Sequence, residues 1–116
     1  MTPDDFRRIA LSMPGAVESS HMGHPDFRAG GKIFATLGPT GKVWAMVKLT
    51  PDQQRDFVAE APEIFAPVNG AWGRSGCTNV RLEFVDEATL QGALTCAFRN
   101  VRGPGTAPRK RAARRS

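Results

Sequence analysis

The sequence predicts a single α+β domain in which helices cover one face of an antiparallel sheet of four to five strands, in two layers. Three observations predict it: three segments with helical periodicity, short apolar runs joined by glycine-rich turns, and their order, α-β-β-β-α-(β)-β-α. Neighbouring strands joined by short turns favour an antiparallel sheet with segregated helices. A chain of 116 residues has room for one domain. We assign residues 1–102 to this domain.

Each expected helix starts at a recognisable signal. Thr2 precedes a proline and two acids, so it can cap a helix over Pro3–Met13. Thr50 and Gln53 form a potential capping box for a helix over Pro51–Ala61, which would bury Phe57, Val58 and Ala61. Asp86 can cap the third helix, which ends before Gly103. Its apolar positions have the cleanest helical spacing: Leu90, Ala93, Leu94, Ala97, Phe98 and Val101.

The strands are expected between these helices. A three-stranded meander is predicted over Pro25–Ala29, Lys32–Leu37 and Lys42–Leu49, with turns at Gly30–Gly31 and Gly38–Gly41. Ile64–Val68 is bounded by prolines and is an edge strand at best. Thr78–Phe84 alternates, with Val80, Leu82 and Phe84 expected on one face. The segments before Pro25 and over Asn69–Gly76 are expected to be loops, with Trp72 packed down.

The positive charge of the chain is concentrated at its end. The net charge is +5 and the isoelectric point is about 10.0. Residues 1–102 contain eleven Lys or Arg and all eleven acids, so this portion is neutral. The five remaining cations are Arg109, Lys110, Arg111, Arg114 and Arg115. Apart from Pro104 and Pro108, residues 103–116 contain no apolar side chain larger than alanine, so we expect a disordered basic tail.

The sequence contains no pattern typical of a catalytic, metal or cofactor site. Cys77 and Cys96 are 19 residues apart and form no CxxC pair. His21 and His24 have HxxH spacing but no further ligands nearby, and a Ser-His-Asp triad in this polar loop is disfavoured. Gly70–Gly76 precedes a strand, whereas phosphate-binding glycine loops precede a helix. With no apolar run long enough for a signal peptide or a membrane span, we expect a cytoplasmic protein without membrane contact.

The second face of the sheet is the strongest candidate for binding. If Ile33, Ala35 and Leu37 face the helices, then Lys32, Phe34 and Thr36 point away from them. In the next strand Val43, Ala45, Val47 and Leu49 would face inward. Trp44, Met46 and Lys48 would face outward and be joined by Arg81 and Glu83. Aromatic side chains interleaved with cations are typical of surfaces on which single nucleic-acid strands stack. An apolar patch fits a homodimer or protein partner equally well, unless the Asn69–Gly76 loop covers it.

A set of collinear motifs over roughly residues 3–102 resembles the MmcQ/YjbR family. The motifs are Met13–Glu18, His24–Arg28, Gly31–Leu37, Val47–Gln54, Phe65–Pro67, Ala71–Arg74 and Val80–Leu82. The resemblance implies a compact α+β domain similar to type III secretion chaperones. Members of this family are commonly labelled DNA-binding, and their strand-and-loop layout is described as a double wing. The resemblance therefore implies DNA binding, with no catalytic residue or cofactor.

Two functions remain open at this stage, and neither is enzymatic. The first is weak, non-specific nucleic-acid binding through the basic tail and the open sheet face. The second is a protein-interaction module that uses the sheet face, to form a homodimer or to bind another protein, without DNA. The candidate binding residues in the domain are Lys32, Phe34, Trp44, Met46, Lys48, Arg74 and Arg81, and those in the tail are Arg109, Lys110, Arg111, Arg114 and Arg115.

Overall fold

The computed structural model describes residues 1–21, 23–38 and 44–102. Its helices are α1 (Pro3–Leu11), α2 (Pro51–Glu60), α3 (Ala71–Arg74) and α4 (Glu87–Arg102). Its strands are β1 (Val17–His21), β2 (His24–Ala29), β3 (Lys32–Leu37), β4 (Trp44–Lys48), β5 (Phe65–Pro67) and β6 (Cys77–Arg81). The expected turn at Gly38–Gly41, the first residues of the third expected strand and the basic tail lie mostly or wholly outside the described residues.

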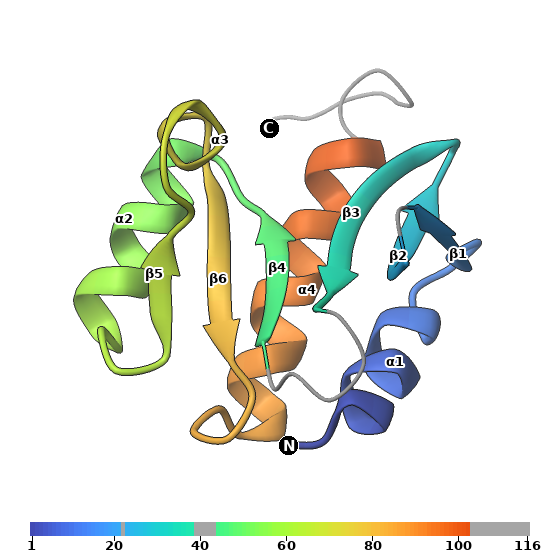
Figure 1. The fold of residues 1–116 in the computed structure, drawn as a ribbon, viewed down its shortest axis with the longest axis horizontal. Coiled ribbons are helices and arrows are strands. Elements are labelled where there is room, and N and C mark those ends of the chain that lie inside the picture. The colour runs from blue at the N-terminus through green and yellow to red at the C-terminus, as the bar shows by residue number, and fades with distance from the viewer. Residues whose placement is uncertain (22, 39–43, 103–116) are drawn as a thin grey trace, which may run out of the picture.

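The strands form one open antiparallel sheet in the order β1-β2-β3-β4-β6-β5 (Figure 1). Every neighbouring pair is antiparallel. The predicted fold class is therefore confirmed. The described sheet has six strands rather than four to five, because β1 was expected to be a loop and β5 is a full member that pairs with β6.

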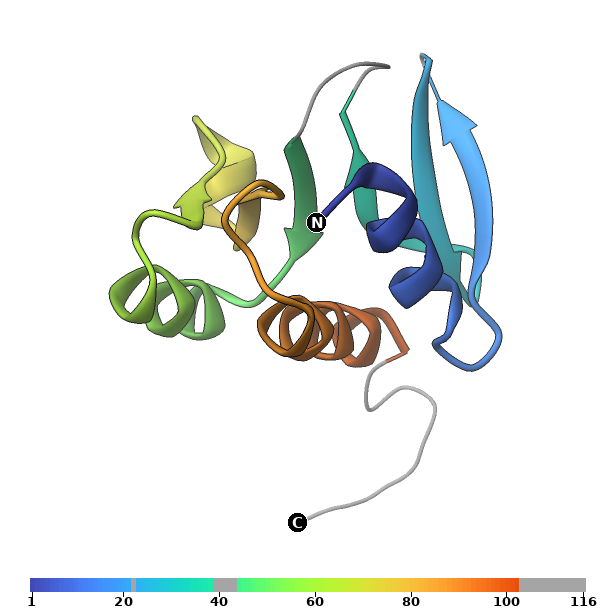
Figure 2. The same cartoon turned by 90° about the horizontal axis from the view of Figure 1, so that it is seen from below.

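The helices α1, α2 and α4 cover one face of the sheet, while α3 lies toward the opposite face (Figure 2). The core between the layers is built from the buried side of α4 and the inward side of the strands. Phe6 of α1 packs on Phe27 of β2 with ring centroids 5.8 Å apart. Phe57 of α2 packs on Phe65 of β5 at 5.0 Å, although Phe57, Val58 and Ala61 are only partly buried.

The predicted helix starts are confirmed by their hydrogen bonds. The Thr50 hydroxyl accepts from the Gln53 amide N–H, and the Gln53 side chain accepts from the Thr50 N–H. Thr2 and Asp5 form the same kind of capping box at the start of α1. Asp86 Oδ1 accepts from the Thr89 N–H at 2.7 Å, a bond that lowers the pKa of Asp86. These bonds satisfy backbone donors that a helix leaves free at its first turn.

Three local expectations were wrong. Val17–His21 is a strand, although it is polar and exposed at every position. Ala71–Arg74 forms a short helix within the expected loop, and Trp72 is 66% exposed rather than packed down. Strand β6 ends at Arg81, so Phe84 lies in the following turn and is 53% exposed. Val80 and Leu82 are buried as predicted.

A bulge in β3 reverses the expected orientation of its first half. Phe27 is opposite Ala35, but Arg28 is opposite Ile33, so Phe34 is one extra residue without a partner in β2. Ala35 and Leu37 face the core as predicted. Phe34, expected on the open face, is instead fully buried, and its ring meets Phe98 of α4 edge-on at 5.7 Å.

The same bulge moves Ile33 and Lys32. Ile33 lies on the open face rather than facing the helices. Lys32 pairs with the buried Ala29 at the hairpin end of β3, so alternation places it on the helical side of the sheet. The predicted outward positions of Lys32 and Phe34 were therefore both wrong.

Candidate functional site

The open face is the surface of the sheet that α1, α2 and α4 leave uncovered. Strand pairing aligns one row of residues across all six strands of this face: Ser19, Asp26, Thr36, Met46, Asn79 and Ala66. Trp44, Met46 and Lys48 alternate with the buried Ala45 and Val47, and therefore point to this side. The face thus presents aromatic, cationic and small polar groups on a rigid sheet.

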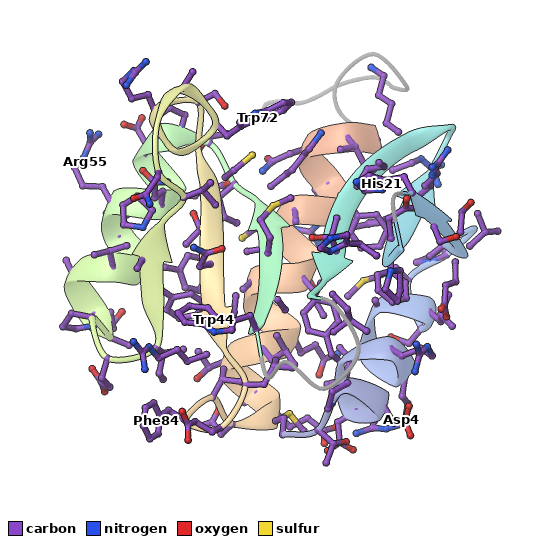
Figure 3. All side chains as sticks on the ribbon, viewed as in Figure 1. Asp4, His21, Trp44, Arg55, Trp72 and Phe84 are labelled. Carbon is purple, nitrogen blue, oxygen red and sulfur yellow. The ribbon has the colours of Figure 1, made fainter. Side chains whose placement is uncertain are left out.

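A groove of about 230 Å³ lies on the open face, and we call it the open-face groove. It is lined by His21, Ile33, Thr36, Met46, Lys48 and Trp72. His21 approaches it from the end of β1 and Trp72 from α3, so segments far apart in the chain form its two sides (Figure 3). Its volume is below the ~300–1,000 Å³ typical of pockets for drug-sized ligands. It therefore suits one small planar group rather than a large molecule.

The helix that carries Trp72, α3, has a tightly packed backbone. A Cβ on Gly73 would lie 1.6 Å from the carbonyl oxygen of Val68, so only glycine fits there. The side-chain amide of Gln54 donates to the carbonyl oxygens of Gly73 and Cys77 at 2.9 and 3.0 Å. These contacts fix the backbone of α3 against α2 and β6, and so they fix the position from which the exposed indole extends.

Trp44 forms a second aromatic position, at the other end of β4. It is 39% exposed, and its partner in the β4–β6 pairing is Arg81. The guanidinium carbon of Arg81 lies 5.0 Å from the centre of the Trp44 ring, a cation–π contact. This pair presents an aromatic surface and a positive charge side by side.

The buried carboxylate of Asp26 organises two cationic or polar side chains beside the groove. Asp26 is 0% exposed and accepts hydrogen bonds from Arg28 Nε at 2.8 Å, Arg28 Nη2 at 3.0 Å and His21 Nδ1 at 2.7 Å. The Arg28 bonds are the main cause that holds the pKa of Asp26 below its ordinary value. The His21 bond adds to this effect, and burial opposes it. The same pairing raises the pKa of Arg28.

Charge is unevenly distributed although the domain is neutral. The six strands contain four Lys or Arg, namely Arg28, Lys32, Lys48 and Arg81, and only two acids. Glu18 is paired with Arg7 of α1, and Asp26 is paired with Arg28 and His21. The other nine acids lie in the helices and the turns around them. Both strand carboxylates are therefore neutralised, while Lys48 and Arg81 remain on the open face.

The structure brings together only part of the predicted set. Met46 and Lys48 line the groove, and Trp44 and Arg81 form the neighbouring pair. Arg74 is exposed but lies elsewhere, beside two larger hollows of about 610 and 510 Å³ between α2, β5 and α3. Lys32 and Phe34 do not join the open face. The five tail cations lie outside the described residues.

Sequence reasoning missed several groove residues. His21 was considered only as a metal ligand or triad member, and Trp72 was expected to pack down. One signal was available for His21. This signal is the glycine at position 23, between the two histidines. In the structure Gly23 has φ +80° and turns the chain, so that His21 of β1 pairs with His24 of β2. Asp26 is two residues after His24 and therefore lies on the same face of the sheet as His21. The hairpin was not predicted because β1 has a polar composition.

The described residues show no arrangement typical of a metal centre or a membrane span. Among residues 1–21, 23–38 and 44–102, no three His, Cys, Asp or Glu side chains gather at one point. Over the same ranges, no helix is both long and apolar enough to cross a bilayer.

Comparison with known proteins identifies the family. The fold is similar to the crystal structure of the Deinococcus radiodurans protein DR2400, a DUF419-domain protein, with a TM-score of 0.76 and 19% sequence identity. The match covers 91% of this chain and 82% of that one. No curated protein matches the sequence. A family model described as YjbR matches residues 11–100, which is most of the chain. The chain therefore belongs to the YjbR family, whose domain is also called DUF419.

Proposed function

We propose that this chain is a non-enzymatic binding protein that holds single-stranded nucleic acid on its open face. The observation that carries the proposal is the Trp44–Arg81 pair, an exposed aromatic ring in cation–π contact with a cation. Proteins that bind single strands combine such stacking surfaces with positive charge along the backbone path. Because every base has an aromatic face, a surface of this kind binds with little sequence preference.

Three further features support this function. Trp72 supplies a second exposed aromatic ring, and Lys48 supplies a second cation on the same face. No strand carboxylate remains unpaired to repel phosphate. The neutral charge of residues 1–102 is therefore compatible with an anionic ligand, because the acids lie mainly on the helical side of the domain.

The basic tail contributes charge to this proposal through its sequence alone. Its five cations are Arg109, Lys110, Arg111, Arg114 and Arg115. Binding that rests on phosphate neutralisation is weak and non-specific, with dissociation constants of about 10⁻⁴–10⁻⁶ M at physiological salt. We expect the tail to provide most of the salt-dependent affinity and the open face to provide stacking.

The test is binding of a labelled 12-nucleotide single strand, measured by fluorescence anisotropy. The Trp44→Ala variant should lose about 1–3 kcal/mol of binding free energy, which corresponds to about 5- to 150-fold in affinity. Phe84→Ala is the matched control because Phe84 is also an exposed aromatic residue but lies outside the strands. Equal affinity of wild type and Trp44→Ala would reject stacking on the open face.

A second function, protein interaction, is favoured by a different observation. Strand β1 is at the edge of the sheet, all five of its residues are exposed, and Val17 is 56% exposed. An uncovered edge strand can pair with a strand of a second chain. Under this alternative, Val17→Lys lowers the molecular mass in light scattering. Nucleic-acid affinity would then be equally weak in every variant.

A further inference from the structure

The open-face groove contains hydrogen-bonding groups that stacking alone does not use. Thr36, His21 and Lys48 line it together with the indole of Trp72. No carboxylate is among its lining residues. The groove therefore combines an aromatic wall with a fixed positive charge and two groups that can bind an oxygen atom.

His21 is held in one orientation at this groove. Its Nδ1 lies 2.7 Å from Oδ2 of Asp26, whose carboxylate is buried and also bound by Arg28. An ionised carboxylate only accepts hydrogen bonds, so the Nδ1 atom of His21 carries the proton in this contact. The second ring nitrogen, Nε2, donates to a phosphate oxygen when it also carries a proton, since both ring nitrogens of an imidazolium are donors. The imidazole remains 45% exposed, so a ligand can reach it.

Arg28 keeps Asp26 from acting as a repulsive charge. Its guanidinium donates through Nε and Nη2 to the two carboxylate oxygens. A bidentate Arg–carboxylate pair is among the strongest charge-assisted contacts in proteins. The buried negative charge is thereby matched, and Lys48 is the charged side chain that lines the groove itself.

We propose that the open-face groove is a subsite for one nucleotide unit, in which Trp72 stacks on the base while Lys48 and His21 bind the phosphate. The inference rests on the proposed function and adds to it the residues that recognise one position of the strand. The volume of about 230 Å³ admits one planar base against Trp72. Lys48 is the phosphate-binding point charge, and His21 is the hydrogen-bonding group that Asp26 positions.

The experiment uses the full chain and deoxyadenosine 5′-monophosphate as the probe. Binding is followed by NMR through the indole N–H signals of Trp72 and Trp44, with deoxyadenosine and inorganic phosphate as comparison ligands. The nucleotide should shift the Trp72 signal more than the Trp44 signal. Because a hydrogen bond to a charged group is lost, His21→Ala and Lys48→Gln should each lower its affinity about tenfold.

His24→Ala is the matched control, because His24 pairs with His21 in the same hairpin but does not line the groove. Because the His24 ring only stacks on His21, with centroids 6.2 Å apart, His24→Ala should lower the affinity for the nucleotide much less than His21→Ala does. Equal affinity for deoxyadenosine and its monophosphate would overturn the phosphate role. A response at Trp44 alone, or loss of binding in His24→Ala equal to that in His21→Ala, would overturn the subsite.

The outcome also separates this inference from the function on which it rests. If the 12-nucleotide strand binds and Trp44→Ala weakens it, but the mononucleotide does not bind, the subsite is wrong and the proposed function stands. If neither ligand binds, both are wrong. His21→Ala leaves Asp26 with one hydrogen-bond partner fewer. If this change disturbs the fold, Lys48→Gln still tests the subsite independently.

Discussion

His21 Nδ1 lies 2.7 Å from Oδ2 of Asp26, so an exposed imidazole at the sheet edge is bound to a carboxylate with no exposed surface. The same carboxylate accepts two hydrogen bonds from Arg28. A buried charge is tolerated only when partners of this kind replace its water. The contact therefore links the stability of the β1–β2 hairpin to the geometry of the open face.

Replacing Asp26 should destabilise the domain in a pH-dependent manner. The pKa of Asp26 is lowered from its ordinary value of 3.8, mainly by Arg28, so the folded state binds its proton less readily than the unfolded state. The resulting stabilisation is present above that ordinary value and is lost as the pH falls through the lowered pKa. We expect Asp26→Asn to lower the free energy of unfolding at pH 7 by about 1–3 kcal/mol.

The measurement is urea unfolding of wild type and Asp26→Asn at pH 7 and at pH 3. The difference between them should shrink at the lower pH, because below the ordinary value of 3.8 the unfolded state takes up a proton at Asp26 more readily than the folded state does. Asp56→Asn, a change at an exposed carboxylate on α2, is the control and should have little effect. A difference that stays constant between the two pH values would show that the charge of Asp26 is not the cause.

Gly73→Ala should destabilise the domain because the backbone approaches too closely for a side chain. The new Cβ would lie 1.6 Å from the carbonyl oxygen of Val68, and backbone cannot move aside cheaply. Overpacking of this kind costs about 1–3 kcal/mol or more. Thermal unfolding measures the effect, and the tryptophan fluorescence, to which Trp44 and Trp72 both contribute, should change as α3 is displaced.

Gly92→Ala is the matched control for this prediction. Gly92 lies in α4, and nothing is within 4 Å of the position its Cβ would take. Alanine is the better helix former, so this change should stabilise the domain by about 0.5–1 kcal/mol. Similar melting temperatures for the two variants would contradict the tight packing described around α3.

Removing residues 103–116 should reduce the salt dependence of binding. The segment contains five Lys or Arg, and each cation that neutralises a phosphate of a single strand contributes about −0.7 to the slope of log K against log salt. We expect deletion to make the slope less steep by at most about 3.5. A slope that is unchanged by the deletion would show that the tail does not contact phosphate.

The helices that begin with a capping side chain were predictable from the sequence. The capping residues Thr2, Thr50 and Asp86 marked three helices correctly, because a side chain that satisfies free backbone N–H groups acts within a few residues. Strand β1 was missed because Glu18, Ser19 and Ser20 give no apolar alternation. An edge strand that is exposed throughout has no buried face to create that pattern.

The open face was predictable only in part, because its composition depends on the bulge at Phe34. Strict alternation placed Trp44, Met46 and Lys48 correctly, since β4 is regular. One extra residue in β3 moved Phe34 into the core and Ile33 onto the open face. Trp72 joins the groove from α3, more than twenty positions after the end of β4 in sequence, and no local pattern indicates that contact.

The central claim, that the open face binds nucleic acid, is tested most directly by mapping the contacts. A single strand containing 4-thiothymidine would be cross-linked to the full-length protein by ultraviolet light, and the modified peptides identified by mass spectrometry. We predict cross-links in the segments that contain Trp44, Trp72 and Arg81, in addition to the basic tail. Cross-links confined to the tail, or to the outer surfaces of α1 and α2, would contradict the claim.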